Sequence, residues 1–212
     1  HFPEAVVVAL LIIGSGVGSL VLGQDINTDL CRYHFYNGYA FAHGRFDTDL
    51  VPAGLGTFLN PTLDSLHYLG ITHRPPRLFG FLLGALQGLN PALVFLLARR
   101  LLEGPGSGTL AVLVGVLAAT GPTAHSSLGT TMGDTTVSIP LLASLLVVLG
   151  GRRTPEERAG APAWLGAGFL AGASMGLKLT MGPHVVALGA LVVLMVLGRK
   201  ARVGAGFAFL AG

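Results

Sequence analysis

Residues 24–77 read QDINTDLCRYHFYNGYAFAHGRFDTDLVPAGLGTFLNPTLDSLHYLGITHRPPR and form one long polar stretch in an otherwise apolar chain. This stretch holds five of the ten acidic residues and four of the seven histidines. Carboxylates and irregular backbone would have no hydrogen-bonding partners in hydrocarbon, so such a segment cannot lie inside a bilayer. We therefore expect residues 24–77 to lie at one face of a membrane.

The composition is that of a membrane protein. The 212 residues are 51% hydrophobic and only 11% charged, with a mean hydropathy of +0.69, whereas about a quarter of the residues in soluble domains are charged. We expect an all-α fold: a polytopic transmembrane helical bundle of six to seven spans in a single domain, 1–212. Nucleic acid is not an expected partner, because the arginines are scattered at helix ends rather than gathered in a stripe.

The spans are predicted from apolar runs of about the 17–25 residues that cross a bilayer, some of them shorter. The first run is too long for the apolar part of a signal peptide, so we interpret it as a retained span. Asn90-Pro91 is expected to bend the second span. The last run is cut short, so we expect the chain to continue past Gly212. The predicted spans are residues 5–22, 78–97, 109–120, 137–149, 164–177, 184–197 and a seventh from Val203.

Orientation follows from the basic residues. Eight arginines and lysines lie in three short connections, near residues 99–100, 152–158 and 199–202. Short basic loops face the cytoplasm. The N-terminus is therefore predicted to be cytoplasmic, and residues 24–77 extracytoplasmic. The connections at 125–134 and 178–184 emerge on that same outer side.

Within the polar stretch we expect two short helices. Residues 30–41 have helical spacing and many aromatic side chains, which suits the membrane interface. Gly44 should end this helix, and Asn60-Pro61 should start a second one over residues 62–69. Cys31, the single cysteine, excludes an internal disulfide and is expected to be a small buried residue.

Two acids stand at the start of the polar stretch. Asp25 and Asp29 are four residues apart, the spacing that places two side chains on one face of a helix. A carboxylate there could take the proton of a hydroxyl group as a general base. Helix capping or a solvated loop charge would use the same residues, so the spacing leaves these interpretations open.

Further candidates for substrate binding lie in the two later outer connections. His125 begins the stretch 125–134, in which two glycines and four hydroxyl residues precede Asp134. Asp134 could equally cap the next helix. Lys178 lies between two leucines near the membrane surface, where an ammonium group needs a partner or must snorkel to water. We expect it to reach a first-loop carboxylate or a lipid phosphate, with snorkelling as the alternative.

Metal binding has weaker support. Asp47-Thr48-Asp49 matches the short acidic pattern that holds a divalent cation in soluble nucleotide-sugar enzymes, but those enzymes use an α/β domain with no counterpart here. Turn and cap roles fit it better, and Asp49 is the better substrate-binding candidate of the two. No histidine pair has a metal-ligand spacing, so no metal ligand is named, and a divalent metal stays open as a cofactor. The histidines considered are His34, His43, His67, His73, His125 and His184.

Three segments together carry a family resemblance. They are residues 24–64, SSLGTTMGDTT at 126–136 and GLKLT at 176–180. In this order, and with the predicted spans around them, the chain resembles the GT-C class of integral-membrane glycosyltransferases. In particular it is similar to the bacterial glycosyltransferase-87-like (DUF2029-type) proteins. The resemblance runs through residues 5–184.

This resemblance implies transfer of a sugar from a polyprenyl-phosphate donor to an acceptor, by inverting displacement, at the outer face of the bacterial inner membrane. Asp25 or Asp29 would be the base, and Lys178, with Arg32 or Arg45, would hold the lipid phosphate. The chain is shorter than GT-C proteins usually are. The alternative is therefore a non-catalytic GT-C-like accessory subunit that contacts membrane lipids and partner membrane subunits.

Overall fold

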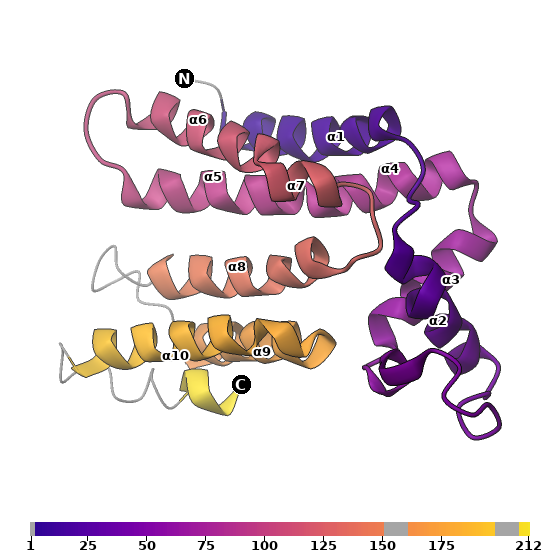
Figure 1. Ribbon diagram of the computed structural model, residues 1–212. Helices are drawn as coiled ribbons and strands as arrows, with labels where there is room; N and C mark the ends of the chain where they lie inside the picture. The colour runs from indigo at the N-terminus through magenta and orange to yellow at the C-terminus, as the bar shows by residue number, and fades with distance from the viewer. Residues whose placement is uncertain (1–2, 151–160, 198–207) are drawn as a thin grey trace. The chain divides into compact units, whose positions relative to one another are not determined.

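The structure, a computed structural model, describes residues 3–150, 161–197 and 208–212. These residues form helices and connecting turns, with no strand among them (Figure 1), which confirms the all-α prediction for this part of the chain. Val203, where the seventh span was predicted to begin, lies outside the described residues. The longer helices are α1 (Glu4–Leu22), α2 (Phe35–Ala42), α3 (Thr62–His73), α4 (Pro76–Gln87), α5 (Leu89–Leu101), α6 (Ser107–Thr120), α7 (Pro122–Ser127), α8 (Asp134–Gly150), α9 (Ala161–Leu177) and α10 (Gly182–Leu197).

Three short helical turns complete this part of the chain. They are the π-helical η1 (Leu30–His34) and the 3-10 turns η2 (Gly54–Phe58) and η3 (Leu179–Met181). The first predicted loop helix is thus η1 followed by α2, and Gly44 follows its end with a φ of +61°, as glycine allows. The second, α3, runs four residues further than predicted.

Two helical segments are long and apolar enough to cross a membrane, judged by length and composition. They are α1 and the 26-residue segment Pro76–Leu101, which consists of α4 and α5. Pro76 at the start of α4 is well placed there, because its missing N–H would have no helical partner. The second segment is interrupted at Gly88, between α4 and α5. This is one turn before Pro91, whose missing N–H leaves the Gln87 carbonyl without its helical hydrogen bond. The third to sixth predicted spans fold as shorter apolar helices.

The helices form two compact units. The bundle unit comprises His1–Val7, Asn90–Ala118 and Val137–Gly212, and the first-loop unit comprises Val8–Leu89 and Ala119–Thr136. In the bundle unit, α8, α9 and α10 share an apolar core that includes Val148, Ala167 and Val192. The Ser144 hydroxyl in this unit donates a buried hydrogen bond of 2.7 Å to the Ala167 carbonyl oxygen.

In the first-loop unit, α1 and α4 lie against each other through small residues. A Cβ atom at Gly84 would be 2.5 Å from the Ser19 Cβ, so only glycine allows this approach. The Ser19 hydroxyl donates to the Gly80 carbonyl oxygen at 2.7 Å and to the Gly16 carbonyl oxygen at 2.9 Å. Small residues and such hydrogen bonds are a usual basis of helix association in membranes.

Beyond the end of α1, helices α2 and α3 form a hairpin (Figure 1). Its interface is partly polar, because His34, Asn37 and Asp64 are all buried there. The aromatic helix α2 buries one face against α3 and leaves Phe41 59% exposed. Its place in the membrane interface stays a prediction. Cys31, which was expected to be buried, is exposed.

The hairpin provides a packing test. A Cβ atom at Gly38 would collide with the Asp64 carbonyl oxygen and with Tyr68 Cβ, so α2 and α3 would have to separate. We expect Gly38→Ala to destabilise the protein by about 1–3 kcal/mol. Gly14→Ala is the matched control, because nothing lies within 4 Å of its Cβ position. Thermal unfolding in detergent micelles should show a lower Tm for Gly38→Ala only; equal Tm values would contradict this packing.

Candidate functional site

The site is built around the Asp25 carboxylate. Gly23, with a φ of +96°, ends α1, and Asp25 follows in a non-helical connection. Oδ2 of Asp25 accepts hydrogen bonds from the backbone N–H and the hydroxyl of Thr131, at 2.7 and 2.8 Å. Oδ1 accepts two from Asn27, at 3.1 Å from the backbone N and 2.7 Å from Nδ2. The first loop and the connection 125–134 therefore meet at this carboxylate.

The prediction that Asp25 and Asp29 share one helical face is wrong. The helix stops at Leu22, because Gly23 takes a left-handed conformation, and Asp29 is the residue that precedes η1. Asn27 links the two segments. Its Oδ1 accepts the Leu30 N–H at 2.8 Å, which caps the start of η1.

The surroundings of Asp25 favour its ionised form. Its partial burial alone would raise the pKa of the carboxyl. The hydrogen bonds from Thr131 and Asn27 outweigh that burial, and the pKa is lowered from its ordinary value of 3.8. The group is therefore a carboxylate at neutral pH, with a fixed orientation.

Asp25 lines a cavity of about 700 Å³ within the first-loop unit. Much of its wall is apolar, with Leu20, Ile71 and Phe79 among the lining residues. Arg77, in the first turn of α4, is an exposed residue that also lines this cavity. In the described part of the chain, Arg77 takes part in no ion pair. One cavity thus combines an anion, a cation and an apolar wall.

A smaller cavity of about 350 Å³ also has Asp25 in its lining. Asn27, Ser126 and His125 line it as well. His125, one of the predicted binding residues, is exposed on α7. It therefore lines the same small cavity as the Asp25 carboxylate.

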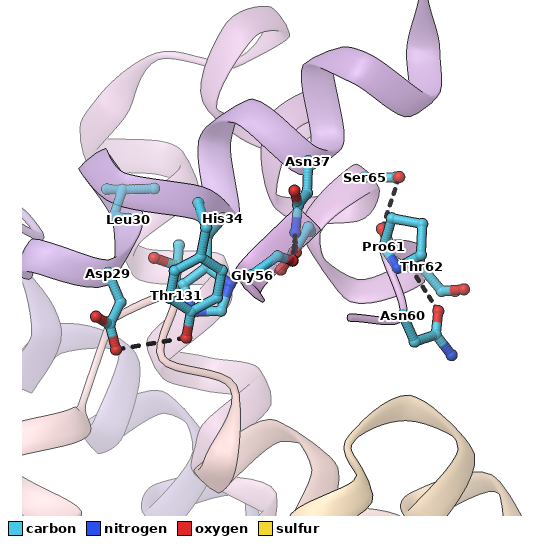
Figure 2. Close-up of polar contacts among 12 residues, drawn as sticks. Asp29, Leu30, His34, Asn37, Gly56, Asn60, Pro61, Thr62, Ser65 and Thr131 are labelled. Carbon is cyan, nitrogen blue, oxygen red and sulfur yellow. Dashed lines mark hydrogen bonds and ion pairs between the residues drawn. The ribbon is translucent and has the colours of Figure 1, made fainter. Parts of the chain in front are cut away.

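Asp29 has a different environment. Its Oδ2 accepts a long hydrogen bond of 3.4 Å from the Tyr33 hydroxyl (Figure 2). Burial and then the negative charges of Asp29 and Asp64, with a smaller effect of Asp134, raise the pKa of Tyr33 to about 12. Tyr33 is thus a hydrogen-bond donor at any physiological pH. Asp134 itself is exposed and is the first residue of α8 rather than the residue before it.

A buried polar cluster lies beside these groups in the α2–α3 hairpin. Nδ1 of His34 is 2.6 Å from Oδ1 of Asp64, and the Asn37 amide donates to Oδ2 of Asp64 at 3.2 Å. The Asn37 amide also donates to the Gly56 carbonyl oxygen at 2.8 Å (Figure 2). His67 is 5% exposed, and burial lowers its pKa to about 4. These histidines, expected to be polar loop residues, are part of the interior.

The remaining predicted binding residues are not assembled at Asp25. Asp49 accepts hydrogen bonds from Arg45 at 2.6 and 3.1 Å and from the Tyr36 hydroxyl at 2.5 Å. The two candidates Asp49 and Arg45 are therefore paired with each other in a surface turn. Arg32 is exposed on η1 and does not line the larger cavity. Lys178 follows α9 in the bundle unit, and its place beside the first-loop acids stays a prediction.

Three residues that build the site are not among those predicted from sequence. They are Thr131, Gln87 and Arg77. Gln87 did carry a signal, because it is a lone amide in an apolar helix, and polar residues at membrane depth are often functional. Thr131 could not be distinguished from its three neighbouring hydroxyl residues until the structure showed which one reaches Asp25.

No group of three or more histidine, cysteine, aspartate or glutamate side chains is arranged to hold a metal ion within residues 3–150, 161–197 and 208–212. No protein-family model matches the chain, and no curated protein or solved structure matches it either. Function must therefore be inferred from the chemistry of the chain's own residues.

The lowered pKa of His67 predicts a pH-dependent stability. At pH values between about 4 and the ordinary histidine pKa of 6.5, His67 binds a proton in the unfolded chain but not in the folded chain. Stability should therefore be full above pH 6.5 and fall as the pH drops toward 4, by up to about 3 kcal/mol. His67→Leu should flatten this part of the profile.

The measurement is thermal unfolding in detergent at a series of pH values. His125→Gln is the control, because His125 is exposed and its loss should leave the wild-type slope. His67→Leu should cost little at neutral pH, because Nδ1 of His67 has no partner among the described residues. A His67→Leu profile parallel to wild type would contradict a buried neutral His67.

Proposed function

We propose that the chain is a membrane glycosyltransferase-like protein that transfers a sugar from a polyprenyl-phosphate donor at the outer membrane face. The observation that carries this proposal is the ionised, oriented Asp25 carboxylate on a cavity that also holds Arg77. The resemblance of residues 24–64, 126–136 and 176–180 to bacterial glycosyltransferase-87-like proteins supports it.

The composition of the larger cavity suits an amphiphilic phosphate. A polyprenyl phosphate has an apolar chain, which Leu20, Ile71 and Phe79 could contact, and an anionic head, which a guanidinium can bind through two parallel hydrogen bonds. Arg45, one predicted phosphate ligand, is already paired with Asp49, whereas Arg77 has no such partner among the described residues. We therefore assign the phosphate to Arg77, with Lys178 and Arg32 as further candidates.

In the proposed step, Asp25 accepts the proton of an acceptor hydroxyl group. The hydroxyl oxygen forms a bond to the anomeric carbon of the donor sugar as the bond from that carbon to the phosphate oxygen breaks. The polyprenyl phosphate leaves with the bonding electron pair, and the anomeric configuration is inverted. His125, in the smaller cavity beside Asp25, would contact the acceptor.

The membrane arrangement belongs to the same proposal. We infer a polytopic bundle of six to seven spans in the bacterial inner membrane, with the N-terminus in the cytoplasm and residues 24–77 outside. The surface of α1 supports it, because Leu10, Ile13 and Val21 are 64%, 54% and 81% exposed, and such a surface suits lipid. The basic residues of the short connections support the orientation.

One observation favours the second candidate, a non-catalytic accessory subunit that contacts partner membrane subunits. Each oxygen of Asp25 already accepts two hydrogen bonds, so its lone pairs are occupied unless one donor gives way to the acceptor hydroxyl. In this alternative the carboxylate only joins two loops. Asp29, with one long hydrogen bond, would then be the less constrained acid.

Replacement of the two acids separates these possibilities. If Asp25 is the base, Asp25→Asn should reduce sugar transfer by at least about 10²-fold, because general-base catalysis typically contributes 10²–10⁴-fold. Asp29→Asn should then retain most activity. The assay follows transfer from a radiolabelled polyprenyl-phosphate sugar by the whole protein in lipid nanodiscs.

The reverse ranking of the two variants would assign the base to Asp29. No transfer by the wild-type protein with any donor sugar, together with purification only in complex with other membrane proteins, would favour the accessory subunit. A folded Asp25→Asn protein with full activity would contradict a catalytic role for this carboxylate.

Arg77 can be tested against a neighbouring arginine. Arg77→Gln should raise the KM for the lipid donor about tenfold or more, because a hydrogen bond to a charged group contributes about 1.5–3 kcal/mol. Arg74→Gln is the matched control, since Arg74 is exposed just before α4 and does not line the cavity. Equal donor KM values for the two variants would remove Arg77 from the phosphate site.

A further inference from the structure

We propose that Gln87 is a positioning residue for Asp25: its buried amide fixes the backbone of residues 129–130 and thereby directs both donors of Thr131 at the carboxylate. The catalytic consequence rests on the proposed function, whereas the positioning of the carboxylate does not. The inference depends on hydrogen bonds within the first-loop unit alone.

Both ends of the Gln87 amide are used. The side chain, at the last position of α4, is 3% exposed. Its Nε2 donates to the Thr130 carbonyl oxygen at 2.9 Å, and its Oε1 accepts the Gly129 N–H at 2.7 Å. An amide that bonds to a donor and an acceptor of adjacent residues fixes both the position and the direction of that backbone.

The turn is confined on its other side by α1. Gly129 has a φ of +74°, and a Cβ atom there would be 2.7 Å from the Ser19 Cβ. The Thr130 hydroxyl closes the turn by donating to the Ser127 carbonyl oxygen at 2.9 Å. Thr131, which is 1% exposed, then presents its N–H and its hydroxyl to one oxygen of Asp25.

Few other hydrogen bonds among the described residues hold Thr131 in this place. Apart from Asp25 itself, its side chain has a hydrogen bond of 3.3 Å from the Asn27 amide. Loss of the Gln87 amide should release residues 129–131 and weaken two of the four hydrogen bonds to Asp25. Because those bonds offset the effect of burial, protonation of Asp25 should become easier.

The charged and titratable groups around Asp25 would stay in place. Arg77 of α4 lines the same cavity, and His125 of α7 lines the smaller one. His67 of α3 interacts electrostatically with Asp25. None of these three groups has a hydrogen bond to Gln87 within the described residues. A change in the protonation of Asp25 would therefore report the loss of the hydrogen bonds between Gln87 and residues 129–130.

The test measures the protonated fraction of Asp25 in the whole chain in lipid nanodiscs. The probe is the carboxyl ¹³C chemical shift at about pH 4, near the ordinary pKa of aspartate. The Asp25 signal is assigned by its absence in Asp25→Asn. Gln87→Met removes both amide contacts at similar volume. Gln87→Asn, which keeps an amide but shortens the side chain, is the second variant in case Gln87→Met does not fold.

We expect a larger protonated fraction of Asp25 in both Gln87 variants than in wild type. Ser144→Ala is the control for a general loss of stability, because it removes a buried hydrogen bond in the bundle unit. This substitution should lower the Tm without changing the protonated fraction of Asp25. An unchanged or smaller protonated fraction in the folded Gln87 variants would overturn the inference.

The transfer assay separates this inference from the proposed function. If Asp25 is the base, the acid limb of the pH profile of kcat/KM should move to higher pH in the Gln87 variants. At neutral pH kcat should fall on the order of tenfold to a hundredfold, as expected for a misplaced catalytic group. A change in Asp25 protonation in a protein that transfers no sugar would support the positioning role and reject the proposed function.

Discussion

The hydrogen bonds between Thr131 and Asp25 are the contact on which the site depends. They join residues that are 106 positions apart and deliver two donors to one carboxylate oxygen. A half-buried carboxylate would otherwise be costly, because burial disfavours its charge. With four hydrogen bonds it remains ionised and fixed, and the start of the first loop is anchored against the turn after α7.

The rest of the first-loop unit supports this contact through close helix packing. Ser19 lies against Gly84 of α4 and against Gly129 of the turn. This single small residue therefore sets both the distance from α1 to α4 and the distance from α1 to the turn. Gln87 then connects α4 to the turn. On the other side, Asn27 bonds to Asp25 and caps η1, so the π-helical turn and the α2–α3 hairpin begin from the same point. The cavity next to Asp25 follows from these fixed elements.

The sequence predicted the helical class, the polar first loop and the polar connection at 125–134, because apolar runs and polar clusters follow from the cost of burying unpaired groups. It also predicted both loop helices. The sequence wrongly placed Asp25 and Asp29 on one helical face. The helix ends at Gly23 because this residue has a positive φ, which the spacing of the two acids does not reveal. The sequence did not predict the buried pair of His34 and Asp64, since a histidine in a loop and one in a polar interior look alike until α2 and α3 are paired.

We propose that the larger cavity binds a polyprenyl phosphate between Arg77 and the ionised Asp25. A cryo-EM structure of the protein in nanodiscs that contain a polyprenyl phosphate would show whether it does. We expect phosphate density within hydrogen-bonding distance of the Arg77 guanidinium, with the Asp25 carboxylate still bonded to Thr131. Phosphate density held by other residues, with the cavity beside Asp25 filled by side chains, would contradict it.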